Sequence, residues 1–506
     1  MRRTAAVVAV TVALATLLAP APPDTGGARA SGTAPARRAA PADLNGDGFD
    51  DLAVGVPGEA LGSRSGAGAL NLLLGSEDGI VPGADVLSQD SQGVGGTAEA
   101  GDAFGAAVAK GRFNDDDHVD LAVGSPGEAV GGVGLAGAVN ILYGSAGGLT
   151  GGRLLLRESP APNDRYGTSL AAGDFNGDTF TDLAVGAPGV NVGAVRDAGA
   201  VTILFGSADG ITPGGAQTLT QGNGGVTGTA EDFDWFGHAL AAGTLAGDDL
   251  ADLVVGVPGE DVGEVGEVGA VNVLAGSPGG LVNGSLVTQG NPEVDDAFGM
   301  AVASGDLDAA AGDDVAVGAF GETVNGRAFA GAVSVLSGPP ERLASERLLH
   351  QGTAGIPGTP ETDDRFGIAL APVDADGVGP WGLAVGVRSE DVGPDVDAGA
   401  VNLLAGSPTG PGGGRLLLQA NPEDSDAFGD AIAGGSSGHD VDGDGFSDLA
   451  VGAPLERVGT RRSAGAVSVF SGSGQGLRTP GRTFVQGGGG LGGTAEAFDA
   501  FGAALA

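Results

Sequence analysis

Three short landmarks recur in fixed order along this sequence, and each occurs seven times. The first is an aromatic residue followed by glycine, the second is a Val-Gly-x-Pro turn, and the third is a glycine that opens a Gly-Ala-Val or Gly-Ala-Leu segment. Successive aromatic–glycine pairs are between 62 residues (Phe104 to Tyr166) and 73 residues (Phe428 to Phe501) apart. Such a period predicts one architecture built from stacked copies of a single unit.

The landmark positions can be read directly from the sequence. The aromatic residues are Phe104, Tyr166, Phe236, Phe298, Phe366, Phe428 and Phe501. The turn glycines are Gly55, Gly124, Gly186, Gly256, Gly318, Gly386 and Gly452, and Phe320 and Arg388 replace the proline in two copies. The third set is Gly68, Gly137, Gly199, Gly269, Gly331, Gly399 and Gly465.

Within each unit, short apolar segments alternate with Gly, Pro and Asp turns. For the unit that begins at Tyr166, this alternation predicts four strands, at about residues 167–172, 182–187, 199–205 and 217–221. A unit of this length cannot bury both faces of its sheet alone, so it must stack on copies of itself. Radial stacking gives a β-propeller, and linear stacking gives a solenoid.

The two ends of the array favour the propeller. The array starts after the place that an aromatic–glycine strand would occupy, and it ends with the missing strand, Phe501-Gly-Ala-Ala-Leu-Ala506. The sequence therefore predicts an all-β fold: a seven-bladed β-propeller of four-stranded antiparallel blades, with the ring closed by the C-terminal strand.

The composition agrees with this fold and excludes several classes of protein. With 101 glycines and only 4% aromatic residues, the core must be built from Ala, Val and Leu, and long helices are disfavoured because Gly is costly inside them. A net charge of −41 argues against nucleic acid or an anionic membrane as a partner. Since there is no cysteine, disulfides, thiolate metal sites and cysteine nucleophiles are excluded.

The N-terminal residues have the pattern of an export signal. Arg2 and Arg3 precede a 14-residue apolar run at 5–18, and Ala28-Arg29-Ala30 is a suitable cleavage site. We expect a signal peptide at 1–30, a Pro/Ala-rich linker at 31–42 and the propeller at 43–506. The run is short for a membrane anchor, so we expect no stable membrane insertion after cleavage. We also expect a monomer that is secreted or loosely associated with the cell surface. The export route, Sec or twin-arginine, stays open.

An acidic loop precedes the turn landmark and has the spacing of a calcium site. In the first copy, Asp43, Asn45, Asp47 and Asp51 occupy positions 1, 3, 5 and 9, and Phe49 at position 7 offers its backbone carbonyl. Oxygen-only ligation of this kind suits a hard cation such as Ca²⁺. The complete sets are Asp43, Asn45, Asp47, Phe49 and Asp51; Asp174, Asn176, Asp178, Phe180 and Asp182; and Asp440, Asp442, Asp444, Phe446 and Asp448.

Four further copies of the loop are degraded. Arg112 stands at position 1 of the second copy, so a salt-bridged loop competes there with a metal site, and Ala310 removes position 5 of the fifth copy. The loops at 244–252 and 374–382 keep too few oxygens, and we expect them to be empty. The weaker candidate ligands are Asn114, Asp116, Asp120, Asp306, Asp308 and Asp314. For every loop, the alternative is an Asx-turn that needs no metal.

The landmarks resemble the FG-GAP repeats of the integrin α-chain N-terminal propeller. The resemblance rests on the Phe-Gly pair at Phe428 and on the Gly-Ala-Pro sequence from Gly452 to Pro454. The resemblance covers nearly all of residues 43–506. It implies a seven-bladed propeller, Ca²⁺ in the DxDxDGxxD loops, and adhesion or ligand recognition outside the cell. Secreted bacterial proteins carry similar repeats.

Two further patterns bear on function. An aspartate stands two positions before every landmark aromatic, which predicts a turn cap, and the aromatic itself is predicted to pack between blades. The variable loops before the aromatic–glycine pairs, such as 222–234 and 352–364, together with Trp235, Arg165 and Arg365, are candidates for recognition.

No motif for a nucleophile elbow, a P-loop or a zinc helix is present, and the four histidines lie in different units. Whether the chain is an enzyme is therefore left open, with the balance against it. We expect a secreted, calcium-stabilised binding or adhesion module for an extracellular protein or carbohydrate. The alternative is an extracellular hydrolase, esterase-like or phospholipase-like, with a site assembled on the propeller face.

Overall fold

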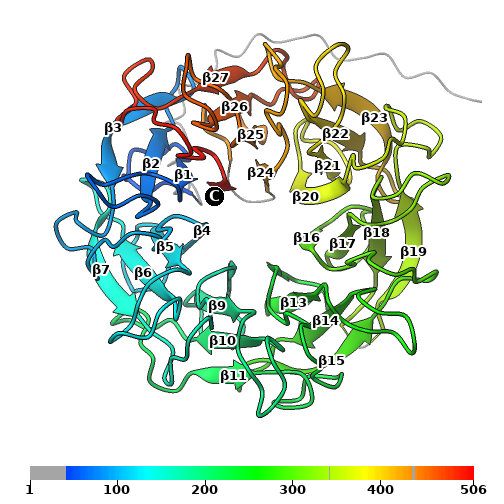
Figure 1. The fold of residues 1–506 in the computed structure, drawn as a ribbon, viewed down its shortest axis with the longest axis horizontal. Helices are drawn as coiled ribbons and strands as arrows, with labels where there is room; N and C mark the ends of the chain where they lie inside the picture. Colours follow the sequence, from blue (N-terminus) through cyan, green and yellow to red (C-terminus); the bar gives the residue numbers. More distant parts are fainter. Residues whose placement is uncertain (1–41, 341, 436–438) are drawn as a thin grey trace, which may run out of the picture. The chain divides into compact units, whose positions relative to one another are not determined.

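The computed structural model describes residues 42–340, 342–435 and 439–506. The described residues belong to one compact unit. The predicted signal peptide and all but the last residue of the predicted linker lie outside the described residues. Every regular element among the described residues is a β-strand, and the strands form seven four-stranded antiparallel sheets (Figure 1). None of the described residues belongs to a helix long and apolar enough to span a bilayer.

The seven sheets follow one another along the chain and are numbered here as blades. Blade 1 contains β28 (Ala504–Leu505), β1 (Leu52–Val56), β2 (Ala69–Leu74) and β3 (Val81–Leu87). Blade 2 contains β4 (Ala107–Gly111), β5 (Asp120–Ser125), β6 (Ala138–Tyr143) and β7 (Thr150–Leu155). Blade 3 contains β8 (Leu170–Gly173), β9 (Asp182–Ala187), β10 (Ala200–Leu204) and β11 (Gln217–Leu219). Blade 4 contains β12 (Leu240–Gly243), β13 (Asp252–Val257), β14 (Ala270–Ala275) and β15 (Val282–Val287).

The remaining three blades repeat this order. Blade 5 contains β16 (Ala301–Gly305), β17 (Asp314–Ala319), β18 (Ala332–Ser337) and β19 (Ala344–Leu349). Blade 6 contains β20 (Phe366–Val373), β21 (Gly382–Val387), β22 (Ala400–Ala405) and β23 (Gly412–Leu417). Blade 7 contains β24 (Ala431–Ala433), β25 (Leu449–Ala453), β26 (Ala466–Phe470) and β27 (Arg482–Phe484).

The first strand of each blade lies nearest the ring centre, and the last strand lies at the outside (Figure 1). Each inner strand contacts the inner strand of the next blade, including β24 with β28 and β28 with β4. The strand β28 pairs with β1, with Leu505 opposite Val54, and the backbone N–H of Ala53 donates to the carbonyl of Ala506 at 2.8 Å. The structure thus confirms a seven-bladed propeller whose ring is closed by the C-terminal strand.

The strands of blade 3 show how closely the sequence pattern predicted the elements. Residues 182–187 were predicted as the second strand, and β9 covers the same residues, with every one buried. The first strand was predicted from residue 167, but β8 begins only at Leu170. The reason is that Gly167 has a left-handed φ of 89° and the segment turns before it enters the sheet.

The three sequence landmarks meet at the junctions between blades. At the junction of blades 3 and 4, Phe236 is fully buried, and its N–H donates to the carbonyl of Ala198 at 3.0 Å. A Cβ at Gly199 would lie 2.2 Å from the carbonyl oxygen of Phe236, and a Cβ at Gly186 would lie 2.1 Å from that of Gly237. The landmark glycines are therefore required because neighbouring blades touch through their backbones, and the predicted packing role of the aromatic is confirmed.

A cluster of polar side chains also joins most blades. Asp234 is buried and caps its turn by accepting the N–H of Glu231, which confirms the predicted capping role. Beside it, the Gln221 amide of blade 3 donates to the Glu260 carboxylate of blade 4 at 2.5 Å. Burial raises the pKa of Asp234 to about 7, with a further contribution from the charge of Glu260. The equivalent pairs are Gln89 with Glu128, Gln289 with Glu322, Gln351 with Glu390, Gln419 with Glu456, and Gln486 with Glu59.

The junction of blades 2 and 3 is built differently. Val190 occupies the glutamate position there, and Arg157 takes the place of the glutamine. The Arg157 guanidinium pairs with the buried Asp164 carboxylate at 3.0 Å. The capping aspartate of this junction is therefore matched by a cation instead of facing a second carboxyl group.

The antiparallel order places two kinds of loop at opposite ends of the blades. We call one end the acidic rim, formed by residues 43–51, 112–120, 174–182, 244–252, 306–314, 374–382 and 440–448, which lead into the second strands. We call the other end the aromatic–glycine rim, formed by the loops that lead into the first strands and the turns that follow the second strands. The loops predicted to bind metal and the loops predicted to take part in recognition thus lie on separate surfaces.

Candidate functional site

The complete acidic loops fold around the carboxylate at their first position. Oδ1 of Asp43 accepts backbone N–H groups from Asn45, Gly46 and Asp47 at 3.2, 2.6 and 3.2 Å, and its Oδ2 accepts that of Gly48 at 2.7 Å. Asp174 and Asp440 make the same kind of bonds within their loops. These are the hydrogen bonds of the Asx-turn alternative. Each carboxylate oxygen has about two lone pairs, so Oδ2 of Asp43, which accepts one N–H, is the oxygen that keeps a lone pair for a cation.

The aspartate at the ninth position ties each loop to its blade. Asp51 is fully buried, and its two oxygens accept the N–H groups of Leu44 and Gly75, both at 2.9 Å. Burial raises the pKa of Asp51 to about 7, and the charges of Asp47 and Asp43 raise it further. The same pair of bonds recurs at Asp120, Asp182 and Asp448. Asp252, in a loop whose other oxygens are mostly lost, makes a similar pair in which the first donor, Ala246, lies one residue later in the loop. The ninth aspartate therefore has a structural role whether or not a metal binds.

The structure brings two sets of predicted ligands together. Asp440, Asp442 and Asp444 offer carboxylate oxygens that lie within 4.8 Å of one another, and so do Asp306, Asp308 and Asp314, which had been predicted as a weaker set. In the other two complete loops an asparagine stands at position 3. The Asn45 amide there donates to Asp47 at 3.1 Å. Crowded carboxylates repel one another, so these oxygen sets fit a divalent cation chemically.

Cationic side chains near the acidic rim bear on two loops. Among the residues that the structure describes, the Arg112 guanidinium makes no ion pair; its backbone N–H donates to the Thr181 hydroxyl at 3.1 Å. The predicted salt-bridged alternative is therefore not seen in that loop. In blade 7, Arg478 reaches Asp444 at 3.3 Å and Asp442 at 3.9 Å, so it competes with a metal for those oxygens.

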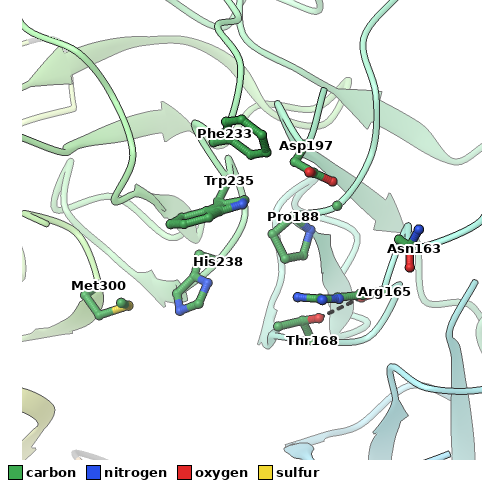
Figure 2. A pocket seen from close by; sticks show the side chains of 10 residues that line it. Asn163, Arg165, Thr168, Pro188, Asp197, Phe233, Trp235, His238 and Met300 are labelled. Carbon is green, nitrogen blue, oxygen red and sulfur yellow. Dashed lines mark hydrogen bonds between the residues drawn. The ribbon is translucent and has the colours of Figure 1, made fainter. Parts of the chain in front are cut away.

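A cavity of about 490 Å³ opens on the aromatic–glycine rim, where loops of blades 3, 4 and 5 converge (Figure 2). The loop into blade 3 contributes Asn163, Arg165 and Thr168, and the turn after β9 contributes Pro188, Gly189 and Asp197. The loop into blade 4 contributes Phe233, Trp235 and His238, and the loop into blade 5 contributes Met300. The pocket combines apolar and aromatic surface with a few polar groups, as small-ligand sites do.

The aromatic groups of the pocket are presented to solvent. The exposed fractions of Phe233 and Trp235 are 39% and 36%, which is unusual for such side chains. The Arg196 guanidinium lies 4.7 Å from the centroid of the Phe233 ring and pairs with Asp232 at 2.7 Å. This cation–π contact holds the Phe233 ring in place beside the cavity.

The polar groups of the pocket differ in charge state. The exposed Arg165 guanidinium makes no ion pair with any residue of the described chain. Burial lowers the pKa of His238, and the charge of Arg165 lowers it further, so the imidazole is neutral at pH 7. The Thr168 hydroxyl donates to the Arg165 carbonyl at 2.7 Å (Figure 2).

Arg165 and Trp235 were predicted as recognition candidates, and both line this cavity. Arg365 does not; its guanidinium lies 5.9 Å from the centroid of the Phe320 ring. Three other lining residues, Phe233, His238 and Met300, were not among the predicted candidates. His238 and Met300 directly follow the aromatic–glycine pair. A signal was present, because the seven residues at this position differ widely in size and charge: Ala106, Thr168, His238, Met300, Ile368, Asp430 and Ala503.

Comparison with known proteins supports the repeat assignment. The FG-GAP repeat family model matches residues 36–70, 166–204 and 432–470. Phosphatidylinositol-glycan-specific phospholipase D of Rattus norvegicus is 34% identical over 228 residues, which are 43% of this chain and 26% of the relative. Integrin alpha-5 of Xenopus laevis is 32% identical over 230 residues, 43% of this chain and 20% of the relative. Integrin alpha-7 of Homo sapiens is 35% identical over 155 residues, 30% of this chain and 12% of the relative.

The chain spans about a quarter or less of the length of these relatives. A periplasmic gluconolactonase of Pseudomonas aeruginosa aligns with a TM-score of 0.46 and 16% identity over 88% of this chain and 98% of that structure, and this level of likeness does not bear on function. The repeats, the integrin similarity and the observed blades agree with one another. This chain is a seven-bladed β-propeller with FG-GAP repeats in three places, and it is similar to integrin α chains.

Proposed function

We propose that this chain is a secreted, calcium-stabilised propeller whose aromatic–glycine rim binds an extracellular protein or glycan. The observation that carries the proposal is the pocket of Figure 2, where the loop into blade 4 presents two exposed aromatic rings and the loop into blade 3 presents an arginine without an ion-pair partner among the described residues. Similarity to integrin α chains supports a binding role. Loops on a rigid scaffold are a common place for recognition, and the backbone-to-backbone junctions make this scaffold rigid.

Secretion is part of the same proposal. Residues 1–30 would act as the signal peptide and residues 31–42 as a linker, and the mature chain would be a monomer. N-terminal sequencing of the protein from culture medium tests this. A mature chain that begins near Ser31 is the expected result. Retention of the full N-terminus in a membrane fraction would contradict it.

The proposed metal sites are the three complete loops on the acidic rim. Ca²⁺ would be held by the sets that begin at Asp43, Asp174 and Asp440, with Asp306, Asp308 and Asp314 as a further candidate set. A bound cation would neutralise the mutual repulsion of the carboxylates. Extracellular modules bind Ca²⁺ with a Kd of about 10⁻⁴ to 10⁻³ M, so 10 mM Ca²⁺ would stabilise the folded state by about 1.4 to 2.7 kcal/mol per site.

Chelation tests the metal proposal. Metal-free protein in excess EDTA should melt at a lower temperature than the same protein in 10 mM Ca²⁺. Mg²⁺ at the same concentration serves as the control, because it retains its water shell and suits these loops less well. Melting curves that coincide in Ca²⁺ and EDTA would overturn the proposal.

The alternative function is an extracellular hydrolase. The similarity to phosphatidylinositol-glycan-specific phospholipase D is the observation in its favour, although the matched region is only 26% of that relative. Against it, the Thr168 hydroxyl in the pocket donates to a backbone carbonyl instead of to His238, so the nucleophile–base contact that acyl or phosphoryl transfer needs is missing there.

One experiment separates the two functions. The purified chain is applied to an array of extracellular glycans and matrix proteins, and the same preparation is assayed for release of product from ester and phosphodiester substrates. The binding proposal predicts saturable retention on at least one array member and no turnover. Turnover that is lost on substitution of a pocket residue, without any retained ligand, would favour the hydrolase.

A further inference from the structure

The pocket loop contains bulky residues at positions that strain the backbone. In all seven copies the residue before the landmark aromatic has a left-handed φ, between 52° and 59°. Alanine fills four of these positions, whereas Arg165, Trp235 and Arg365 fill the other three. Left-handed backbone costs an ordinary L-residue roughly 1 to 2 kcal/mol, and a large side chain does not relieve this cost.

Phe233 shows the same anomaly two residues earlier. It has a φ of 72°, whereas Asn163, Asp295, Asp363 and Ser425 at the equivalent position are short and polar, as left-handed positions favour. Of the two remaining copies, one has Gly101 and the other has Phe498, which is also left-handed and exposed, so it is the pairing of Phe233 with Trp235 beside a cavity that sets this loop apart. Phe233 and Trp235 thus combine strained backbone with exposed rings, so neither gains full burial in return. Strained residues of this kind cluster at ligand sites, where the surrounding structure holds them in place.

The charge of the pocket is also unusual for this protein. The chain carries a net charge of −41, yet the Arg165 guanidinium beside the cavity has no ion-pair partner within the described residues. An unpaired guanidinium offers a planar fork of donors that matches a carboxylate. Asp197 on the opposite wall would repel a dianion such as a phosphate monoester, but it can accept hydrogen bonds from hydroxyl groups.

We propose that this pocket binds a pyranose ring that bears a carboxylate, that is, a hexuronate unit of an acidic glycan. The C–H face of the ring would lie on the Trp235 indole, the carboxylate would meet Arg165, and ring hydroxyls would bond to Asn163 and Asp197. The volume of about 490 Å³ is in the range of small-ligand sites. This inference rests on the proposed binding function and names its ligand class.

The experiment uses the indole itself as the reporter. The chain has two tryptophans, Trp235 and the partly buried Trp381, so Trp381→Phe leaves Trp235 as the single tryptophan, which is excited selectively over the two tyrosines. This protein is titrated with glucuronate, galacturonate and trigalacturonate, and with the matched neutral sugars glucose, galactose and maltotriose. The expected result is a saturable change in emission with the uronates, at concentrations at least about tenfold below those needed for the neutral sugars.

Two variants locate the contact in the pocket. Arg165→Ala should weaken uronate binding about tenfold or more and leave the affinity for neutral sugars unchanged, because only the carboxylate contact is lost. Arg327→Ala, which removes an exposed arginine from the turn after β17, should leave both affinities unchanged. The melting temperature of each variant is measured to show that it is folded.

Several results would overturn the inference. These are equal affinities for acidic and neutral sugars, uronate binding that survives Arg165→Ala, binding of decanoate or benzoate in preference to any uronate, or no response to either sugar class. If an array ligand is retained equally well by the wild type, Trp235→Ala and Arg165→Ala, the inference fails while the binding function stands. If the array retains nothing, both fail.

Discussion

The carboxyl groups buried at the blade junctions predict that this acidic protein loses stability as the pH rises through neutrality. At the junction of blades 4 and 5, burial raises the pKa of Asp296 from 3.8 to about 7, and Glu322, Glu293 and Asp295 raise it further by their charges. Burial also raises the pKa of Glu322, although the hydrogen bond from Gln289 opposes the shift. The folded state therefore binds more protons than the unfolded state between about pH 4 and 7.

The sign and size of the effect follow from these shifts. A raised pKa stabilises the fold fully below the unfolded value of 3.8, and this stabilisation is lost as the pH rises through about 7. Three pKa units correspond to about 4 kcal/mol, which solvent screening reduces to about 1 to 2 kcal/mol per junction. The capping aspartates of four junctions, Asp234, Asp296, Asp364 and Asp426, have a pKa raised to about 7 or 8. For a chain of this length, 1 kcal/mol shifts the melting temperature by about 1 °C, so these four junctions predict a fall of about 4 to 8 °C between pH 5 and pH 8.5.

The assay is differential scanning calorimetry across this pH range at constant ionic strength and constant Ca²⁺. Glu322→Gln keeps a hydrogen-bond acceptor for Gln289 but removes one ionisable group, so its melting temperature should fall less with pH than that of the wild type. The comparison between the two proteins cancels the contribution of the acidic loops. A wild type that is more stable at pH 8.5 than at pH 5, or a variant with an unchanged pH slope, would refute the reasoning.

Three further changes have expected outcomes. Gly318→Ala places a Cβ 2.1 Å from a carbonyl oxygen of the next blade, and urea denaturation should show a loss of about 1 to 3 kcal/mol in the free energy of unfolding. The control Gly134→Ala has open space around the added Cβ and should change this free energy little. Deletion of residues 501–506 removes the closing strand and should lower the melting temperature by more than 10 °C (about 10 kcal/mol at about 1 °C per kcal/mol); an unchanged melt would contradict the closed ring. Asp444→Ala should reduce the stabilisation by Ca²⁺, and Asp248→Ala, in a loop expected to be empty, should not.

The fold could be predicted because the landmarks encode contacts between blades. The glycines at Gly186 and Gly199 admit no side chain, and the aromatic at Phe236 fills the space between them. These requirements are the same at every junction, so they leave a regular mark on the sequence. The late start of β8 could not be predicted, because the pattern does not show how far the turn at Gly167 extends.

The polar contacts between blades were harder to predict. Gln221 and Glu260 are 39 residues apart in sequence, and only the ring geometry brings the amide and the carboxylate together. The second role of Asp51, as an acceptor of two backbone N–H groups, was likewise not visible in a ligand pattern. Sequence spacing identifies which oxygens can converge, but it does not show which of them already accept hydrogen bonds from backbone N–H groups.

The pocket was predicted only in part, for a related reason. Trp235 and Arg165 stand out in loops that consist mostly of small and polar residues, although the neighbouring Phe233 was not singled out. His238 and Met300 directly follow an aromatic–glycine pair. The residue type at this position varies between copies, but any exposed position that tolerates substitution would vary in the same way. Their convergence depends on the ring that brings the loops into blades 3, 4 and 5 side by side, and a single repeat contains no information about that arrangement.

The central claim is that the two rims have separate tasks: the acidic rim binds calcium, and the aromatic–glycine rim binds a ligand. A crystal structure of the chain grown in 10 mM Ca²⁺ with the ligand selected on the array tests both at once. We expect cations in the loops that begin at Asp43, Asp174 and Asp440, and the ligand in contact with Trp235. Loops closed by hydrogen bonds alone, with the ligand bound away from the aromatic–glycine rim, would contradict it.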